Sequence, residues 1–199
     1  KEDLNTETHP GVPEYSYQPK SILEDVIVLP YNDIEKSKEL IHKFKDDLSC
    51  IIMEPIISNF GYLPLDLEFI KFIREITEEL GIVLIFDEIQ SFRVSSGGAQ
   101  ESFGITPDMT TLGKIIGGGL PVGAFGGKDE IMELFDPTSS NYDIAHAGTF
   151  NGNPLTMEAG VTVMENLTSD NFEKMNNLGD SLRSKLSSVF NEINLHVQV

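Results

Sequence analysis

Apolar residues in the first half of the chain occur either in short runs or in helically spaced series. The short runs, which have the length and the β-branched content of strands, lie at 26–29, 50–53 and 82–86. Between them, apolar positions three and four residues apart predict one helix beginning at Asn32 or Asp33 and another from Asp66 to Gly81. This order of strand, helix, strand, helix, strand predicts an α/β fold whose open, mostly parallel sheet is flanked by helices.

The second half of the chain has a different pattern. Ten of the 17 glycines lie between Gly97 and Gly127, which indicates tight turns and close backbone contacts around the short apolar segment 109–112. Beyond Asn153 the spacing is helical again, and a long amphipathic segment covers 171–193. The apolar face predicted for the first of these helices carries Leu155, Ala159, Val163 and Leu167.

Composition narrows the class of protein. The chain has 199 residues and a formal net charge of -18, which argues against nucleic acid or an anionic membrane as a partner. No run approaches the ~20 apolar residues of a membrane span. Cys50 is the only cysteine and the four histidines are scattered, so we expect no disulfide within the chain, no metal site and a cytoplasmic setting.

Polar side chains follow the predicted strands at the points where they end. Glu54 and Asn59 come after one strand, Asp87 and Glu88 after the next, and Lys114 after the segment 109–112. In open parallel sheets, ligands bind beyond the carboxyl ends of the strands. These residues are therefore the first candidates for chemistry.

The run 83–88, four apolar residues followed by Asp-Glu, also occurs in the magnesium-binding strand of P-loop ATPases. That reading requires a phosphate-binding loop in which Gly-Lys is followed by Ser or Thr. Gly113-Lys114 precedes an isoleucine and Gly127-Lys128 an aspartate, so neither forms such a loop. An ATPase module would need the loop outside this segment.

Lys114 lies in a stretch of glycines and apolar residues, 111–123. Partial burial there would favour the neutral amine, which attacks a carbonyl to form a Schiff base. A solvated lysine in a flexible glycine loop is the simpler interpretation of the lysine alone. Asp87 favours the Schiff-base interpretation over the solvated lysine. An aspartate at the same sheet edge could keep a pyridine nitrogen protonated while the lysine holds an aldehyde carbon.

Four motifs in order then resemble a known family. The chain is similar to class III pyridoxal-phosphate (PLP) aminotransferases, in the branch of glutamate-1-semialdehyde aminomutase and the β-amino acid aminotransferases. The similarity runs from about Gly11 to the C-terminus, and its motifs are Glu54-Pro55, Phe86-Asp87-Glu88, the glycines around Lys114, and 147–154. It implies the large domain of a fold-type I PLP enzyme.

The resemblance also implies roles for single residues. Lys114 matches the lysine that forms the Schiff base and moves a proton, and Asp87 matches the partner of the pyridinium nitrogen, which makes the ring an electron sink. Ile89 matches the aliphatic side chain under the ring, and Asn59 a residue near its phenolic oxygen. Taken without the family, Asn59 is an ordinary turn residue and Ile89 an ordinary core residue.

Two further positions connect the cofactor to a partner and to the ring. Thr149 matches a threonine that reaches the phosphate of the neighbouring subunit, so the resemblance implies a homodimer with a shared active site. Gln90 matches a glutamine that contacts the ring oxygen in many class III members, a purpose that Asn59 serves in the aminomutase branch.

The substrate stays open at this stage. Residues 97–101 are similar to the aminomutases, whereas the shortened spacing from Asp87 to Arg93 and the segments 123–127 and 135–137 are similar to the β-amino acid aminotransferases. A mutase moves an amino group between adjacent carbons of one molecule. A transaminase releases a keto product and needs a second substrate, such as 2-oxoglutarate.

Family members are about twice as long as this chain. The resemblance therefore predicts a fragment in which 1–166 belongs to the PLP-binding large domain, and 167–199 forms a connecting helix and the start of a small C-terminal domain. Such a fragment is expected to be inactive alone and to bind PLP poorly. A non-catalytic fragment or scaffold that keeps the fold is the alternative from a different functional class.

Overall fold

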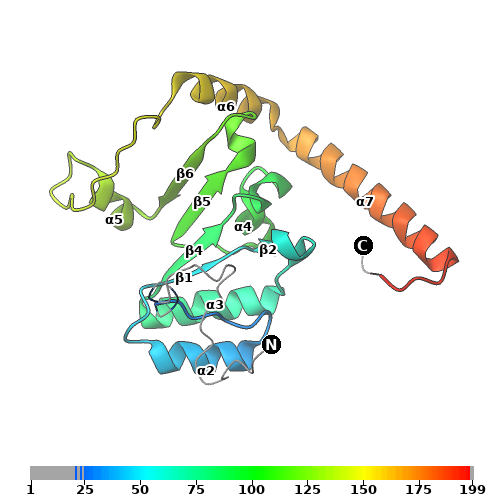
Figure 1. Ribbon diagram of the computed structural model, residues 1–199, viewed down its shortest axis with the longest axis horizontal. Helices are drawn as coiled ribbons and strands as arrows, with labels where there is room; N and C mark the ends of the chain where they lie inside the picture. Colours follow the sequence, from blue (N-terminus) through cyan, green and yellow to red (C-terminus); the bar gives the residue numbers. More distant parts are fainter. Residues whose placement is uncertain (1–20, 22, 24, 198–199) are drawn as a thin grey trace.

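The structure, a computed structural model, describes residues 21, 23 and 25–197. Its central sheet has four strands in the order β1-β4-β5-β6, with bounds Cys50–Met53, Val83–Asp87, Met109–Gly113 and Gly123–Gly127 (Figure 1). β1, β4 and β5 are parallel, and β6 is antiparallel to β5. The mostly parallel α/β sheet expected from the sequence is therefore confirmed.

One face of the sheet is covered by two stacked helices, α2 (Ile34–Phe44) and α3 (Leu67–Leu80) (Figure 1). α2 begins at Asp33, whose carboxylate accepts a hydrogen bond from the Lys36 N–H. α3 ends at Gly81, which adopts the left-handed conformation with φ 69°. The buried core between sheet and helices contains Ile41, Ile51, Phe69, Ile70, Ile73, Leu84 and Phe86.

The opposite face of the sheet is more open. Side chains alternate along a strand, so Leu84 and Phe86 of β4 face the helices, while Ile85 and Asp87 face the other way and are half-buried. On β1, Ile52 is the register partner of Ile85 and is 59% exposed. The open face therefore includes the end of β4 that carries Asp87.

Short elements follow the carboxyl ends of the parallel strands. After β1 the chain forms a small two-stranded sheet around a turn, and after β4 and β5 it forms 3-10 turns and a short helix. Their bounds are β2 Ile56–Ile57, η1 Ser58–Phe60, β3 Leu63–Pro64, η2 Ser91–Val94, α4 Gly98–Phe103 and η3 Lys114–Gly117.

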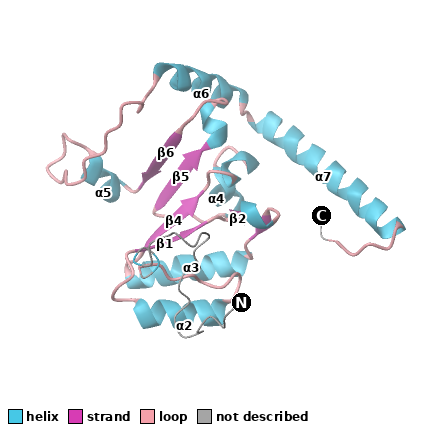
Figure 2. Cartoon of the chain, viewed as in Figure 1, coloured by secondary structure: helices cyan, strands magenta, loops and turns pink. Residues whose placement is uncertain are grey.

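The C-terminal part contains two longer helices. A small unit, α5 (Asp129–Met132) with η4 (Glu133–Phe135), is joined by an extended loop to α6 (Pro154–Asn166) (Figure 2). α6 packs on η3, and the long helix α7 (Ser169–Glu192) then projects away from the sheet (Figure 1). The predicted domain boundary at 166/167 falls in the short link between α6 and α7, and the division into two domains stays a prediction.

Three expectations from the sequence are corrected. Residues 26–29 form no strand, and only an isolated bridge occurs at Ile27. Part of the glycine-rich stretch is not loop but strand β6. The buried positions of α6 are Thr156 and Gly160, whereas Leu155 of the predicted apolar face is 75% exposed. The loop predicted for residues 1–20 lies outside the described residues.

Candidate active site

Asp87 ends β4 beside the strand that leads to Lys114. The register pairs Asp87 with Thr111 of β5, and the Glu88 N–H donates to the Thr111 carbonyl oxygen at 3.0 Å. The Asp87 carboxylate accepts one hydrogen bond from another described residue, the Ile89 N–H at 3.0 Å. A half-buried carboxylate with an uncommitted oxygen thus lies at the carboxyl end of two parallel strands.

Lys114 follows β5 directly and opens the turn η3. Its backbone is in the left-handed region with φ 48°, which costs a residue other than glycine about 1–2 kcal/mol. Its side chain is exposed and enters no hydrogen bond or ion pair with another described residue, so the partial burial expected from its surroundings is absent here. Backbone strain of this kind concentrates at functional positions.

The lysine lines an open hollow of about 580 Å³ beyond the carboxyl ends of β4 and β5. The other residues of the hollow come from the segment after β4 and from the glycine-rich turn, and they are Ile89, Gln90, Arg93, Ile115, Gly119, Leu120 and Pro121. Three of the six predicted site residues, Lys114, Ile89 and Gln90, therefore meet in one place.

Ile89 also covers the end of β5, the strand that leads to the lysine. A Cβ atom placed on Gly113 would be 3.5 Å from a methyl group of Ile89, so the isoleucine side chain lies over the end of β5. Beside it, the Thr111 hydroxyl is buried and has no hydrogen-bond partner among the described residues. Since Thr111 is the register partner of Asp87, an aliphatic surface, an uncommitted carboxylate and an unpaired hydroxyl adjoin on the open face.

The remaining two predicted residues lie elsewhere. Asn59 is exposed on η1, where the Glu54 carboxylate shapes the turn by accepting from the Ser58 N–H and hydroxyl at 3.1 and 2.7 Å. Thr149 is exposed on the loop between η4 and α6. Neither lines the hollow with Lys114.

From the sequence alone, Arg93 had no site role, and Glu88 was a candidate without a role. Arg93 lines the hollow and brings a second cation beside Lys114. Glu88 is completely buried immediately after Asp87. Glu88 directly follows an apolar strand, where a carboxylate that becomes buried requires several donors around it. The sequence around Arg93 gave no comparable signal.

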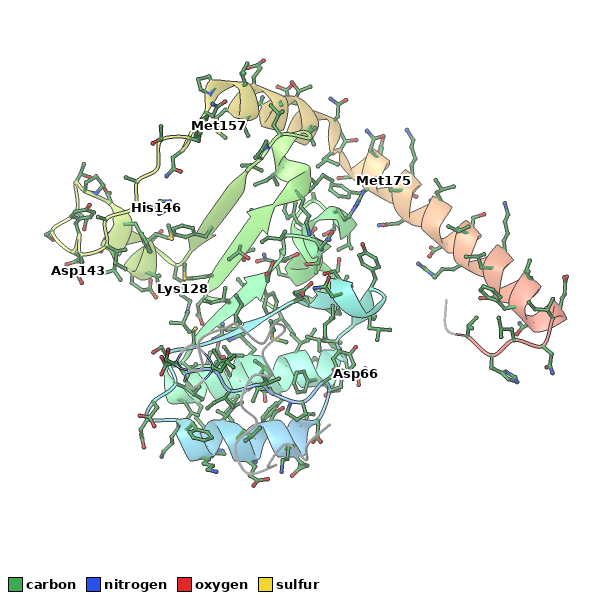
Figure 3. The ribbon with its side chains drawn as sticks, in the orientation of Figure 1. Asp66, Lys128, Asp143, His146, Met157 and Met175 are labelled. Carbon is green, nitrogen blue, oxygen red and sulfur yellow. The ribbon has the colours of Figure 1, made fainter. Side chains whose placement is uncertain are left out.

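A separate charged cluster lies at the opposite end of β5. The buried Asp108 carboxylate accepts from the Leu84 N–H at 2.7 Å and pairs with Lys128 at 2.7 Å and Arg74 at 3.0 Å. Burial opposes ionisation of Asp108, but these three donors outweigh it and hold its pKa below the ordinary value. Figure 3 shows Lys128 at the end of the sheet away from Met157 of α6. The cluster therefore stabilises the fold at that end and is not part of the hollow.

Among the described residues, no group of three or more His, Cys, Asp or Glu side chains could hold a metal ion. No helix in the described part of the chain combines the length and the apolar character needed to cross a bilayer.

The chain is similar in sequence and structure to known aminomutases and transaminases. The chain is 44% identical over 190 residues to glutamate-1-semialdehyde 2,1-aminomutase 1 of Staphylococcus epidermidis, covering 95% of the chain and 44% of that protein. Among solved structures, it is 44% identical to an omega-transaminase from Sphaerobacter thermophilus, with a TM-score of 0.89, covering 92% of this chain and 42% of that one. It is 33% identical to a transaminase with PLP bound, with a TM-score of 0.87 and coverages of 91% and 43%.

The two solved structures share the fold of the chain, and all three proteins exceed it in length. The chain spans less than half the length of the relatives it matches. The family model described as aminotransferase class-III matches residues 3–198. The chain therefore belongs to the class-III aminotransferase family.

Proposed function

We propose that the protein carrying this chain transfers amino groups with pyridoxal 5'-phosphate, and that Lys114 is the residue to which the cofactor is attached. The observation that carries the proposal is the position of Lys114, on a strained turn one strand away from Asp87, at the carboxyl edge of the sheet. The relatives that share this sheet include a transaminase with PLP bound. PLP, when bound, supplies an aldehyde and a pyridinium ring that withdraws electrons from the reacting carbon.

The residues at the sheet edge match the needs of that cofactor. The uncommitted oxygen of Asp87 can accept a hydrogen bond from a protonated ring nitrogen, and its charge keeps that nitrogen protonated. Ile89 offers an aliphatic surface for the ring, next to the buried Thr111 hydroxyl, which has no hydrogen-bond partner among the described residues. The open face of the sheet leaves room for the ring, and the residues therefore fit PLP at its ring and aldehyde ends.

Lys114 and Gln90 complete the roles that we assign. The Lys114 amine would hold the cofactor by its aldehyde and, when released as a free base, would accept a proton from the substrate carbon and return it to another carbon. Gln90 lines the hollow with Lys114, so its amide can bond the oxygen substituent of the ring. We assign the same ring oxygen to Asn59 as an alternative contact, from the exposed turn η1.

The phosphate end of the cofactor requires a second subunit in this proposal. Thr149 is exposed on the η4–α6 loop and does not line the hollow, so it is free to reach the phosphate bound by a partner. We therefore propose a cytoplasmic homodimer with shared active sites. In each subunit, residues 1–166 would belong to the cofactor-binding large domain and 167–199 to the start of the small domain.

The substrate is an amino acid or an amino-aldehyde, and two reactions compete. The aminomutase relative favours glutamate-1-semialdehyde, whose amino group would move between adjacent carbons. The equal identity to an omega-transaminase supports a transaminase as the second candidate. We assign to it transfer from a β-amino acid to 2-oxoglutarate, because the segments 123–127 and 135–137 are similar to the β-amino acid aminotransferases. Every residue discussed above serves both reactions, since the two share the proton transfer at Lys114.

A direct assay separates the candidates. The protein expressed from its complete gene is incubated with PLP and glutamate-1-semialdehyde, and separately with a β-amino acid and 2-oxoglutarate. We expect turnover of the semialdehyde without an added amino acceptor. Turnover that occurs only with 2-oxoglutarate would assign the transaminase, and a protein that binds no PLP and turns over neither would be the non-catalytic scaffold.

A further inference from the structure

Glu88, the residue after Asp87, is completely buried and accepts four hydrogen bonds. Oε2 accepts from the Ala99 N–H at 2.6 Å and the Ser91 hydroxyl at 3.0 Å. Oε1 accepts from the Gln100 N–H at 3.0 Å and the Gln100 side-chain amide at 3.1 Å. All of these donors lie on the segment that follows β4, so one carboxylate gathers residues up to 12 positions away.

The local sequence is built around this carboxylate. A Cβ atom on Gly98 would be 2.6 Å from Oε2 of Glu88, and Gly98 has φ 76°, so only glycine allows the approach. The Gln100 side chain also donates to the Thr110 hydroxyl at 3.1 Å. The network therefore ties the segment after β4 both to α4 and to β5, the strand that leads to Lys114.

The residues after Glu88 line the hollow, and the residue before it carries the carboxylate at the end of β4. Asp87 precedes it, and Ile89 and Gln90 follow it beyond the end of the sheet ladder. Backbone bonds hold Glu88 to the Thr111 carbonyl and Phe92 to the Glu88 carbonyl. In residues 88–92, the Glu88 side chain is the main further anchor, and its hydrogen bonds lie outside the hollow.

We infer that Glu88 is a positioning residue, whose buried carboxylate sets Asp87, Ile89 and Gln90 in the orientation that binds the cofactor ring. The inference rests on the proposed PLP chemistry. Glu88 itself does not line the hollow and acts only through its neighbours.

The variant E88Q tests this. An amide presents one oxygen and one NH2 group. Whichever way it is oriented, its NH2 group faces a backbone N–H, that of Ala99 or that of Gln100. Two donors then point at each other, and a backbone N–H cannot rotate away. The matched control is E101Q, because the exposed Glu101 carboxylate accepts from the Gly97 N–H at 2.9 Å in the same segment. S91A is a milder variant that removes a single donor, should E88Q fail to fold.

Two measurements are made on the protein expressed from its complete gene. Hydrogen exchange without cofactor follows the amides of residues 87–90 and 98–100. Titration with PLP gives its dissociation constant and the absorption spectrum of the bound form. For E88Q we expect faster exchange in both segments, a dissociation constant raised about tenfold and a shifted absorption maximum, while S91A shows about a threefold change and E101Q none.

The possible outcomes are distinct. An E88Q protein that melts at a lower temperature but retains wild-type exchange at 87–90, PLP affinity and spectrum would show a purely structural role and overturn the inference. Should E88Q not fold, wild-type values in S91A would overturn it equally. A wild-type protein that binds no PLP would overturn the proposed function and, with it, this inference.

Discussion

Gly160 of α6 lies against the turn that follows Lys114. A Cβ atom on Gly160 would be 2.6 Å from the carbonyl oxygen of Ile116, a separation that real Cβ atoms do not adopt. Gly118, at the end of the same turn, has φ 60° and faces the backbone of Ala159 equally closely. The two glycines allow the backbone of α6 to contact the backbone of η3. The helix therefore packs directly against the turn that Lys114 opens.

The variant G160A is therefore expected to destabilise the protein. Alanine gains about 1 kcal/mol of helix propensity over glycine, but here the new methyl group must push the Ile116 carbonyl away, at a cost of about 1–3 kcal/mol. We predict a net loss of about 1 kcal/mol in the free energy of unfolding, measured with urea. G179A in α7 is the control, since its nearest neighbour would be Arg183 at 3.9 Å, and it should gain stability. Equal gains in both variants would contradict the contact.

The strain at Lys114 gives a second prediction. Both K114G and K114A remove the side chain, but only glycine adopts φ 48° without a penalty. In the absence of cofactor, K114G should be about 1 kcal/mol more stable than K114A by urea unfolding. A K114G protein no more stable than K114A would indicate that the turn relaxes in solution.

Asp108 predicts a pH dependence of stability. Its pKa is lower in the folded protein than the ordinary value of 3.8, so its stabilising contribution is complete above that value and is lost as the pH falls through the folded-state pKa. D108N leaves Lys128 without its carboxylate and Arg74 with Glu78 alone, and should cost about 3 kcal/mol at pH 7.

The difference between wild type and D108N should shrink below about pH 4, as urea unfolding across pH 3–7 would show. D136N provides the comparison. The pKa of Asp136 is also lowered, by the Thr138 N–H, but this carboxylate is fully exposed and should have little effect on stability. A D108N deficit that is constant with pH would contradict the ion cluster.

Replacing Asp87 tests the ring partner. In D87N the amide cannot keep a ring nitrogen protonated, so kcat/KM for the substrate that the protein turns over should fall about 100-fold or more. D143N, in the exposed loop of Figure 3, should leave kcat/KM unchanged. A D87N protein within a few fold of wild type would remove Asp87 from the site.

Local signals in the sequence predicted much of the sheet and its helices. The caps at Asp33 and Gly81 lie where the helix-start and helix-stop residues predicted them. β6 was missed because Gly123–Gly127 has almost no side-chain pattern, and its pairing with β5 alone makes it a strand. The apolar face predicted for α6 was only partly right. Ala159, Val163 and Leu167 are partly buried, but the fully buried positions are Thr156 and Gly160, because close backbone contact there selects small residues.

The site was predictable to the extent that it depends on strand ends. Parallel strands bring their carboxyl ends together, so Asp87 and Lys114 were expected at one edge, and the register places them there. The roles of all six predicted residues stay predictions. Asn59 lies on the turn expected for it and Thr149 on a loop, and no strand or helix pattern predicts how such residues lie relative to the hollow.

The central claim is that Lys114 carries the cofactor. The protein expressed from its complete gene is loaded with PLP, reduced with borohydride, digested and examined by mass spectrometry. We predict one phosphopyridoxyl group, on the peptide that contains Lys114, and its loss together with the visible absorbance band in K114A. A group attached to another lysine, or a wild-type protein that takes up none, would contradict the account.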